Sequence, residues 1–331
     1  MRKRIQEVNP IQTVKKMNKA SSLQQWLDQR RDTQRGATRH GDLIIPHQEI
    51  TKLNVAAYYK SVAPWLLRHM KNRPLSLLRF PDQSGQNCFF QNDTTENRQL
   101  TDVHQIKAKD QMPSYINNES GLLQLVQWGV LEVQTWLSHK DEPLLADQIV
   151  FDLDPDRAVK WSEVKRAALQ MKGVLERLGM KAFLKTTGGK GLHLHVPIAA
   201  IYNWHEVKAF ARSVVLELES RWPNRYTADR SKKVRKGKIF VADLSKVFGA
   251  TVIAPYSLRS TEAAYVAMPL DWSELPDLKS PQVFDIKKTL HRLAYQKSDP
   301  WGNYSSLKQK ILKNPADFAT ADNCKISRVS H

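Results

Sequence analysis

Cysteine is scarce in this sequence: its 331 residues include two, Cys88 and Cys324. Two cysteines so far apart along the chain exclude a disulfide framework and a zinc site built on paired cysteines, and they indicate a reducing cytoplasm. Long hydrophobic runs are missing as well, since no segment approaches the ~18 consecutive apolar residues that span a bilayer. The charged start MRKRIQEV is not followed by the apolar stretch of a secretory signal. We therefore expect a cytoplasmic protein with no membrane partner.

Negative charge is the second shortage. Asp and Glu number 33 against 51 Lys and Arg, which leaves a formal net charge of +18. A balance this basic suits a polyanion, most often nucleic acid, so we expect a nucleoid-associated protein. Enhanced solubility or a loose attraction to anionic membranes would produce the same composition. The hydrophobic fraction of 41% is enough for a substantial core in one or two domains.

The pattern of apolar residues predicts helices and strands in a mixed order. Residues 1–36 hold nine Lys or Arg against three acids and form a basic arm, either disordered or a short helix. Beyond the arm, the spacing predicts three helices: one that begins at Thr51, one that Ser162 would cap and Gly179 would end, and one over 205–222. It also predicts strands over 130–136, 149–154, 181–187, 192–198 (with alternating apolar residues) and 239–244. Such a mixture is typical of an α/β or α+β fold.

Two carboxylates follow the apolar segment IVF. Asp152 and Asp154 are two residues apart, so in a strand they share one face. Like charges this close repel each other and indicate a positive partner. Three interpretations stay open: a divalent metal site, because Mg²⁺ prefers carboxylate and phosphate oxygens; an aspartate nucleophile of a phosphatase; or solvated acids at an exposed strand end.

The segment TTGGKGLHLH adds groups suited to phosphate. Successive backbone N–H groups of a Gly-rich turn form an anion-binding nest, and Lys190 adds a positive charge. His193 and His195 share one strand face, which would also suit a zinc ion, although no third ligand is evident nearby in the sequence. Metal-binding acids followed by a phosphate cradle, in a very basic protein, favour metal-assisted nucleotide chemistry.

Four segments in order resemble the polymerase domain of bacterial ligase D, a family of the archaeo-eukaryotic primase superfamily that acts in non-homologous end joining. They are FDLDPD, KTTGGKGLHLHVPI, KGKIFVADL and GATVIAPYSLR, and the likeness covers about residues 38–300. The resemblance implies an α+β (mixed α/β) fold: a primase-type catalytic core with an RRM-like sheet and additional strands and helices. It also implies the boundaries of a polymerase domain over residues 37–312, after the arm and before a tail of 313–331. No nuclease or ligase segment is recognisable, so we expect a stand-alone polymerase domain.

The resemblance also implies the roles of individual residues. Asp152 and Asp154 would be metal carboxylates and, with His193, catalytic; the metal is Mn²⁺ or Mg²⁺ and the substrate an NTP or dNTP. The positions that would hold the incoming nucleotide are Thr187, Gly188, Gly189, Lys190, His193 and Arg259. Those that would contact DNA are Lys52 (on a 5′-phosphate), Arg79, the pair Phe89 and Phe90 (stacked on template bases), Lys232, Lys233, Arg235 and Lys236. For the two phenylalanines, core packing is an equally good interpretation.

The sequence departs from the family at its third metal carboxylate. An ungapped alignment through KGKIF and GAT places Ala242 at that position, with Asp243 one residue further on. Because a shift of one residue turns a side chain to the other face of a strand, Asp243 could serve as the third ligand only through a bulge or a slipped register.

Further departures concern polar positions. Gln134 stands where the family has a histidine, and Asp42 stands where a phosphate-binding lysine is common. Ser245 and Lys246 replace an arginine and an asparagine. Neither alanine nor glutamine supplies a full charge, so these changes are expected to impair chemistry more than nucleotide binding.

Two functions follow from these motifs. The first is a metal-dependent nucleotidyltransferase, a DNA-directed DNA or RNA polymerase, that fills gaps or extends DNA ends before joining. The second is a catalytically impaired polymerase homologue that binds or bridges DNA ends. Expected partners are double-strand breaks, gaps and overhangs with 5′-phosphates, a Ku-like protein and a separate DNA ligase. The sequence leans slightly towards the enzyme, on condition that Asp243 reaches the site.

Overall fold

The computed structural model describes residues 49–80, 88–94, 100–245, 247–261 and 263–311, together with the backbone of 43–45. The basic arm of residues 1–36 and the tail of 313–331 lie outside the described residues, so their predicted boundaries stay predictions. No helix within the described ranges combines the length and the apolar character needed to cross a membrane.

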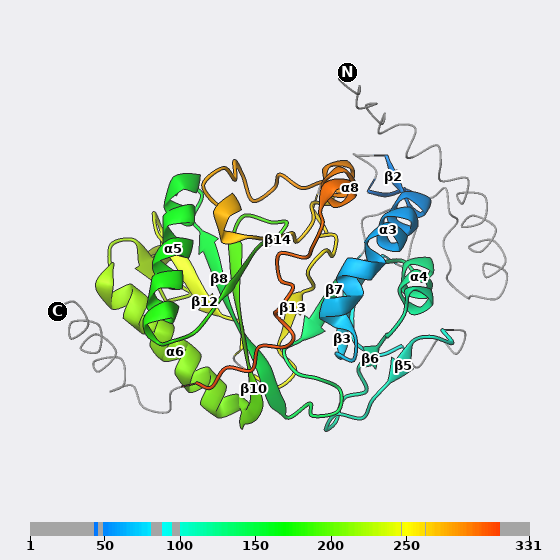
Figure 1. Ribbon diagram of the computed structural model, residues 1–331, viewed down its shortest axis with the longest axis horizontal. Coiled ribbons are helices and arrows are strands. Elements are labelled where there is room, and N and C mark those ends of the chain that lie inside the picture. The colour runs from blue at the N-terminus through cyan, green and yellow to red at the C-terminus, as the bar shows by residue number, and fades with distance from the viewer. Residues whose placement is uncertain are drawn as a thin grey trace, which may run out of the picture.

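A six-stranded sheet forms one half of the molecule (Figure 1). Neighbouring strands pair antiparallel, apart from the parallel pair at the β11 edge. Helices α5 (Trp161–Arg177) and α6 (Trp204–Arg221) pack on this sheet. The strands in spatial order are β11 (Tyr226–Thr227), β12 (Ile239–Asp243), β8 (Leu145–Pro155), β10 (Leu192–Asn203), β9 (Phe183–Thr186) and β14 (Pro269–Leu270).

A four-stranded sheet lies in the other half, beside helices α3 (Lys52–Met70) and α4 (Glu119–Gln127) (Figure 1). Its strands in spatial order are β13 (Thr251–Ile253), β7 (Val130–Trp136), β3 (Leu75–Arg79) and β4 (Phe89–Gln91). The remaining elements are the pair β1 (Leu43–Ile45) and β2 (Ile50–Thr51), the pair β5 (His104–Gln105) and β6 (Ser114–Tyr115), the short helix α7 (Lys232–Arg235), a 3₁₀ turn (Trp272–Glu274) and helix α8 (Ile286–Tyr295).

Local sequence signals account for most element boundaries. Thr51 caps α3 as predicted, because its hydroxyl accepts the backbone N–H of Asn54 at 3.2 Å. Asn203 and Glu206 form a capping box at the start of α6. Gly179, the residue after the C-cap Leu178 of α5, has a φ of 72°, a left-handed conformation that suits glycine. Strand β7 spans the predicted residues.

The predicted start of α5 is wrong by two residues. Lys160, rather than Ser162, is the residue before the helix, and Trp161 is its first residue. The Trp161 indole N–H donates to the carbonyl oxygen of Leu278 at 2.6 Å, so a tertiary contact anchors the first turn. The buried face of α5 is the predicted one, made by Val164, Ala167, Ala168, Met171, Val174 and Leu175.

Both sheets contribute to one contiguous hydrophobic core. It contains Phe151 and Leu153 of β8, Leu131 and Val133 of β7, and Val55 of α3, each at most 1% exposed. A shared core means that the two halves support each other and that strand ends from both sheets can contribute to one site.

Candidate functional site

The two acids lie on one face of β8, as the alternation of the sequence predicts. Asp152 pairs across the sheet with His193 of β10 on one side and with Ala242 of β12 on the other. Asp154 pairs with Phe240. Directly opposite residues share a sheet face, so these side chains point the same way.

Asp243 is on the other face of the sheet. The register of β12 against β8 runs without interruption from Ile239 opposite Pro155 to Asp243 opposite Phe151. Phe151 is a fully buried core residue on the helix side, and Asp243 lines a cavity of about 210 Å³ together with Lys208 and Arg212 of α6. The expectation that Asp243 replaces the missing carboxylate is therefore wrong: no bulge turns it towards Asp152, and Ala242 occupies the position.

His193 is a buried neighbour of Asp152. Its Nε2 lies 3.5 Å from Oδ1 of Asp152, and its side chain is 7% exposed. Burial lowers the pKa of His193 well below its usual value, and the positive charges of Lys185 and Arg259 lower it further. The ring therefore favours its neutral form, with Nε2 facing the carboxylate and Nδ1 buried without a hydrogen-bond partner among the described residues.

Lys185, which sequence reasoning missed, lies in the same row. It pairs with His193 across β9 and β10, its side chain is fully buried, and its Nζ donates to the carbonyl oxygen of Ile253 in β13 at 2.9 Å. Burial and Arg259 lower the pKa of the Lys185 ammonium, whereas the charges of Asp152 and Glu132 oppose that change. The ammonium therefore ties the six-stranded sheet to the four-stranded sheet at the base of the site. A lysine inside the apolar strand FLKT was the available signal.

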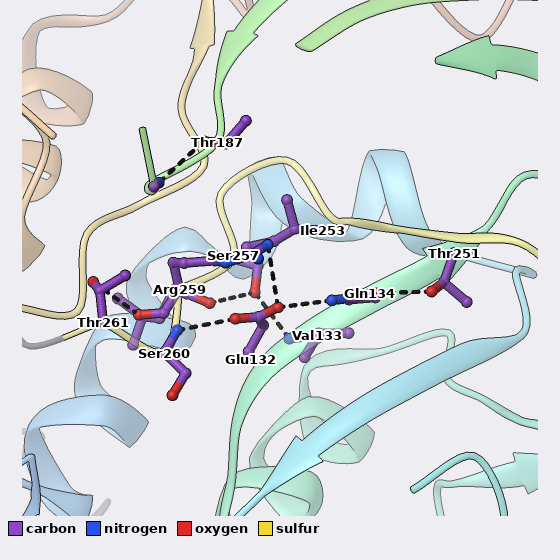
Figure 2. Close-up of polar contacts among 12 residues, drawn as sticks. Glu132, Val133, Gln134, Thr187, Thr251, Ile253, Ser257, Arg259, Ser260 and Thr261 are labelled. Atoms are coloured by element: carbon purple, nitrogen blue, oxygen red, sulfur yellow. Dashed lines mark hydrogen bonds and ion pairs between the residues drawn. The ribbon is translucent and has the colours of Figure 1, made fainter. Parts of the chain in front are cut away.

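Arg259 belongs to a polar network on the four-stranded sheet (Figure 2). Its guanidinium lies 3.5 Å from the buried carboxylate of Glu132, which also accepts the backbone N–H of Ser260 at 2.9 Å. Gln134 donates to Glu132 at 2.8 Å and accepts the hydroxyl of Thr251 at 2.8 Å. The Gln134 amide, at the position where the resemblance predicts a histidine, thus has both ends bound within the protein. Glu132 was also missed, because a lone acid in the strand VLEVQTW gives no sign of its partners.

The Gly-rich loop joins β9 to β10. The Thr187 hydroxyl accepts the Gly189 N–H at 3.1 Å and donates to the Gly191 carbonyl oxygen at 3.2 Å. Gly188 has a φ of 69°, and a Cβ there would lie 2.9 Å from the Arg259 Cβ and from the Tyr265 carbonyl oxygen. The structure therefore brings the loop and Arg259 together, as the predicted nucleotide site requires. Lys190 is exposed at the tip of the loop.

Arg235 lies against the acids. Its guanidinium forms an ion pair with Asp154 and stacks 4.5 Å from the ring of Phe240. The prediction for Arg235 is a contact with DNA. In this conformation its guanidinium instead neutralises a carboxylate of the site. Lys232, Lys233 and Lys236, from the same short segment, are exposed and available to a phosphate backbone.

The other predicted DNA contacts differ in exposure. Phe89 and Phe90 on β4 are 45% and 55% exposed, so the alternative of core packing is wrong for both. Arg79 is half-buried, stacks 4.1 Å from the Trp128 ring and donates to the Trp128 carbonyl oxygen. Lys52, at the first position of α3, is fully buried, so its ammonium is out of reach of an external 5′-phosphate in this conformation.

Three departures from the family remain to be placed. Ser245 is fully buried, and its hydroxyl accepts the Val150 N–H at 3.2 Å, so it extends the pairing beyond the end of β12. Asp42 and Lys246 lie outside the described residues, and their predicted roles stay untested.

The donor set fits one divalent ion rather than two. Asp152 and Asp154 provide two carboxylates on one face, which suits an ion that is also held by substrate phosphates. A two-metal centre needs a further anionic ligand, and the position opposite Asp152 is Ala242. Within the described part of the chain, no three His, Cys, Asp or Glu side chains gather closely enough to hold an ion by themselves.

Residues 51–301 match the family model of the LigD primase-polymerase domain. The chain is 35% identical over 278 residues to the multifunctional non-homologous end joining protein LigD of Pseudomonas aeruginosa, covering 81% of this chain and 32% of that protein. It is 27% identical to the bifunctional protein of Bacillus subtilis, covering 77% and 41%. The chain thus spans a third to two-fifths of these relatives.

A solved structure gives the same result. The polymerase domain of Mycobacterium tuberculosis ligase D, in complex with DNA, superposes with a TM-score of 0.69 at 29% identity, covering 78% of this chain and 93% of that one. The predicted fold, a primase-type polymerase domain of mixed α and β structure, is confirmed.

Proposed function

Because the chain belongs to the LigD primase-polymerase domain family, we propose that it binds DNA ends and nucleotide in non-homologous end joining, with strongly reduced nucleotidyl transfer. The observation that carries the proposal is the row across the six-stranded sheet: Ala242 lies opposite Asp152, while Asp243 faces α6. Loss of the third carboxylate removes a ligand of the ion that activates the attacking hydroxyl. It leaves the phosphate-binding groups in place.

Nucleotide binding is supported by the loop and by Arg259. Gly188 packs against Arg259, and the charge of Arg259 acts on His193. Thr187, the backbone of Gly188 and Gly189, Lys190 of the same loop and Arg259 would hold the triphosphate. An Mn²⁺ or Mg²⁺ ion on Asp152 and Asp154 would neutralise phosphate charge. The neutral His193 would accept or donate a hydrogen bond there without adding charge.

DNA-end binding is supported by charge and exposed aromatic rings. Phe89 and Phe90 present two rings to solvent on a short edge strand, where each stacked base would contribute ~1–3 kcal/mol. The net charge of +18 supplies attraction to the phosphate backbone. The M. tuberculosis domain was solved with DNA. A Ku-like protein and a DNA ligase are the proposed partners, and the nucleoid is the proposed location.

Active transfer is the second candidate, because the Asp152–Asp154 pair and the nucleotide loop are retained. In that case the wild-type protein extends a primer on gapped or recessed DNA with Mn²⁺, and Asp152→Ala abolishes the extension. Ribo- and deoxynucleotides are both tested, since the name of the matched family model refers to primase as well as polymerase.

Restoring the carboxylate tests the proposal directly. We expect Ala242→Asp to raise Mn²⁺-dependent extension at least tenfold, because the new side chain lies directly opposite Asp152. Primer extension on a gapped duplex, together with calorimetric titration of Mn²⁺ into the protein, measures both consequences.

Asp243→Asn is the matched control, because Asp243 is one residue away on the other sheet face. It should leave extension unchanged. Robust extension by the wild-type protein that Asp243→Asn abolishes would contradict the proposal.

A further inference from the structure

The solvent face of α8 is basic and aromatic. Lys287, Lys288, His291 and Tyr295 are one, three and four positions apart, so they form one stripe on the helix. All four are exposed, and Tyr295 at 69% is the most exposed large apolar side chain of the described residues. The rings of His291 and Tyr295 lie 5.1 Å apart, so they form a pair open to solvent.

Local helix energetics do not account for the two lysines. The first turn of α8, which the structure describes in full, holds no acidic residue. Cations at a helix N-terminus oppose the macrodipole and are unfavourable there. The carboxylate of Asp285, the capping residue, lies 3.7 Å from Lys288 and offsets part of this cost. The resulting positive surface is a site of attraction for anions.

The start of α8 is connected to the nucleotide loop through backbone contacts. Gly188 of the nucleotide loop approaches the carbonyl of Tyr265 so closely that a Cβ would lie 2.9 Å from its oxygen. The next residue, Val266, donates its N–H to the carbonyl oxygen of Phe284 at 2.8 Å. Helix α8 begins two residues later, at Ile286. The phosphate loop, the segment that carries Arg259 and the start of α8 are thus packed side by side.

We propose that this face of α8 binds the single-stranded overhang of a DNA end, an inference that rests on the function proposed above. Lys287 and Lys288 contact backbone phosphates, and Tyr295, supported by His291, stacks on an unpaired base. From Lys287 to Tyr295 the stripe is about 12 Å long, because a helix rises 1.5 Å per residue. That length accommodates a few nucleotides, and the nucleic acid leaves the nucleotide site along it.

Binding of labelled DNA to α8 variants tests the proposal. Fluorescence anisotropy compares a duplex with a short oligothymidine 3′ overhang and the matched blunt duplex. We expect Tyr295→Ala to weaken binding of the overhang roughly 5- to 150-fold, the range for loss of one stacked base, and to leave blunt-end binding unchanged. Tyr295→Phe keeps the ring and should bind as the wild-type protein does. Lys287→Ala/Lys288→Ala should reduce the slope of log affinity against log salt by about 1.4, since each single-strand phosphate contact contributes ~0.7.

The control is Lys208→Ala/Arg212→Ala on α6, which removes the same charge from a helix in the other half of the molecule (Figure 1). The substituted side chains are exposed, so the fold of every variant should stay intact; circular dichroism checks this. Overturning results are an unchanged affinity of Tyr295→Ala for the overhang, or an equal loss in the α6 control. If the wild-type protein binds no DNA end, the proposed function fails as well. If it binds ends and the α8 variants match it, this inference alone fails.

Discussion

At the scale of single residues, Gly191 shows how closely the nucleotide loop is packed onto the strand that carries the acids. A Cβ at this position would lie 2.1 Å from the carbonyl oxygen of Leu153, the residue between Asp152 and Asp154. The backbone of the loop therefore lies directly against the backbone of β8 between the two acids, and only glycine permits that approach. The site depends on this glycine for the relative position of its two parts.

Gly191→Ala should destabilise the protein by about 1–3 kcal/mol, because backbone rather than a flexible side chain must move. Urea unfolding followed by circular dichroism measures the change. Gly173→Ala is the matched control. A Cβ at Gly173, inside α5, meets nothing within 4 Å, so the free energy of unfolding of this variant should rise by roughly 0.5–1 kcal/mol. Equal stabilities of the two variants would contradict the close packing described here.

Residue patterns could predict one part of the site and not the other. The two-residue spacing of Asp152 and Asp154 fixes a shared face, and the structure has that face. Lys185 and Glu132 could not be assigned from the sequence. Lys185 donates to Ile253 of the other sheet, and Glu132 pairs with Arg259 on a later segment, so each of these partners is more than 50 residues away in the sequence. The pairing of Arg235 with Asp154 escaped notice for the same reason: the sequence shows a basic segment, and the fold decides which cation meets a carboxylate.

At the scale of elements, β10 carries two buried histidines on one face. Burial lowers the pKa of both His193 and His195 well below the usual value, and Lys185 lowers it further. His195 Nδ1 lies 3.3 Å from Gln148 Oε1, an atom that also accepts the Tyr304 hydroxyl at 2.5 Å. An amide oxygen only accepts, so His195 carries its proton on Nδ1. Both rings are neutral parts of the sheet.

Stability should therefore fall in mild acid. The unfolded chain takes up protons near pH 6.5, whereas the folded strand resists them, so this stabilisation is complete above pH ~6.5 and decreases as the pH falls below it. With two such histidines, the free energy of unfolding should decrease by up to about 2.7 kcal/mol per pH unit. Urea unfolding between pH 7.5 and pH 5, as rough limits, measures it.

His195→Gln should flatten that dependence, because one of the two titrating groups is gone. The exposed His205 of α6 provides the control, since His205→Gln should leave the slope as it is in the wild-type protein. A slope that His195→Gln leaves unaltered would show that the strand does not hold this histidine neutral.

The apolar patterns predicted most strands and helices, but they predicted the register between paired strands less well. Apolar alternation identified β7, β8, β10 and β12, because one face of each is buried. The decisive fact about β12 is its register against β8, and the sequence allowed either a bulge or an unbroken ladder. Backbone pairing over five consecutive residues selected the ladder, which placed Ala242 rather than Asp243 beside Asp152.

At the scale of the whole molecule, two sheets share one core and a net charge of +18. Composition alone predicted a nucleic-acid partner, and the fold gives the charge a location: exposed lysines occur beside the acids in α7 and on α8. A partner bound mainly through phosphates releases counterions, so its affinity depends on salt.

Binding of DNA ends should weaken roughly 100-fold or more between about 50 and 200 mM salt, the loss expected for about four phosphate contacts. Anisotropy titrations of a labelled duplex across that range, with and without EDTA, give the slope. Phe89→Ala/Phe90→Ala should lower affinity while preserving the slope, because stacked rings release no counterions. Affinity that is independent of salt would be incompatible with binding through the basic surfaces.

The pairing of Arg235 with Asp154, beside Ala242 rather than a third acid, has a consequence for the cell. A cluster of three carboxylates would need a cation to relieve its repulsion, whereas this face meets part of that need from its own side chains. The fold would then persist when divalent metal is scarce in the cell.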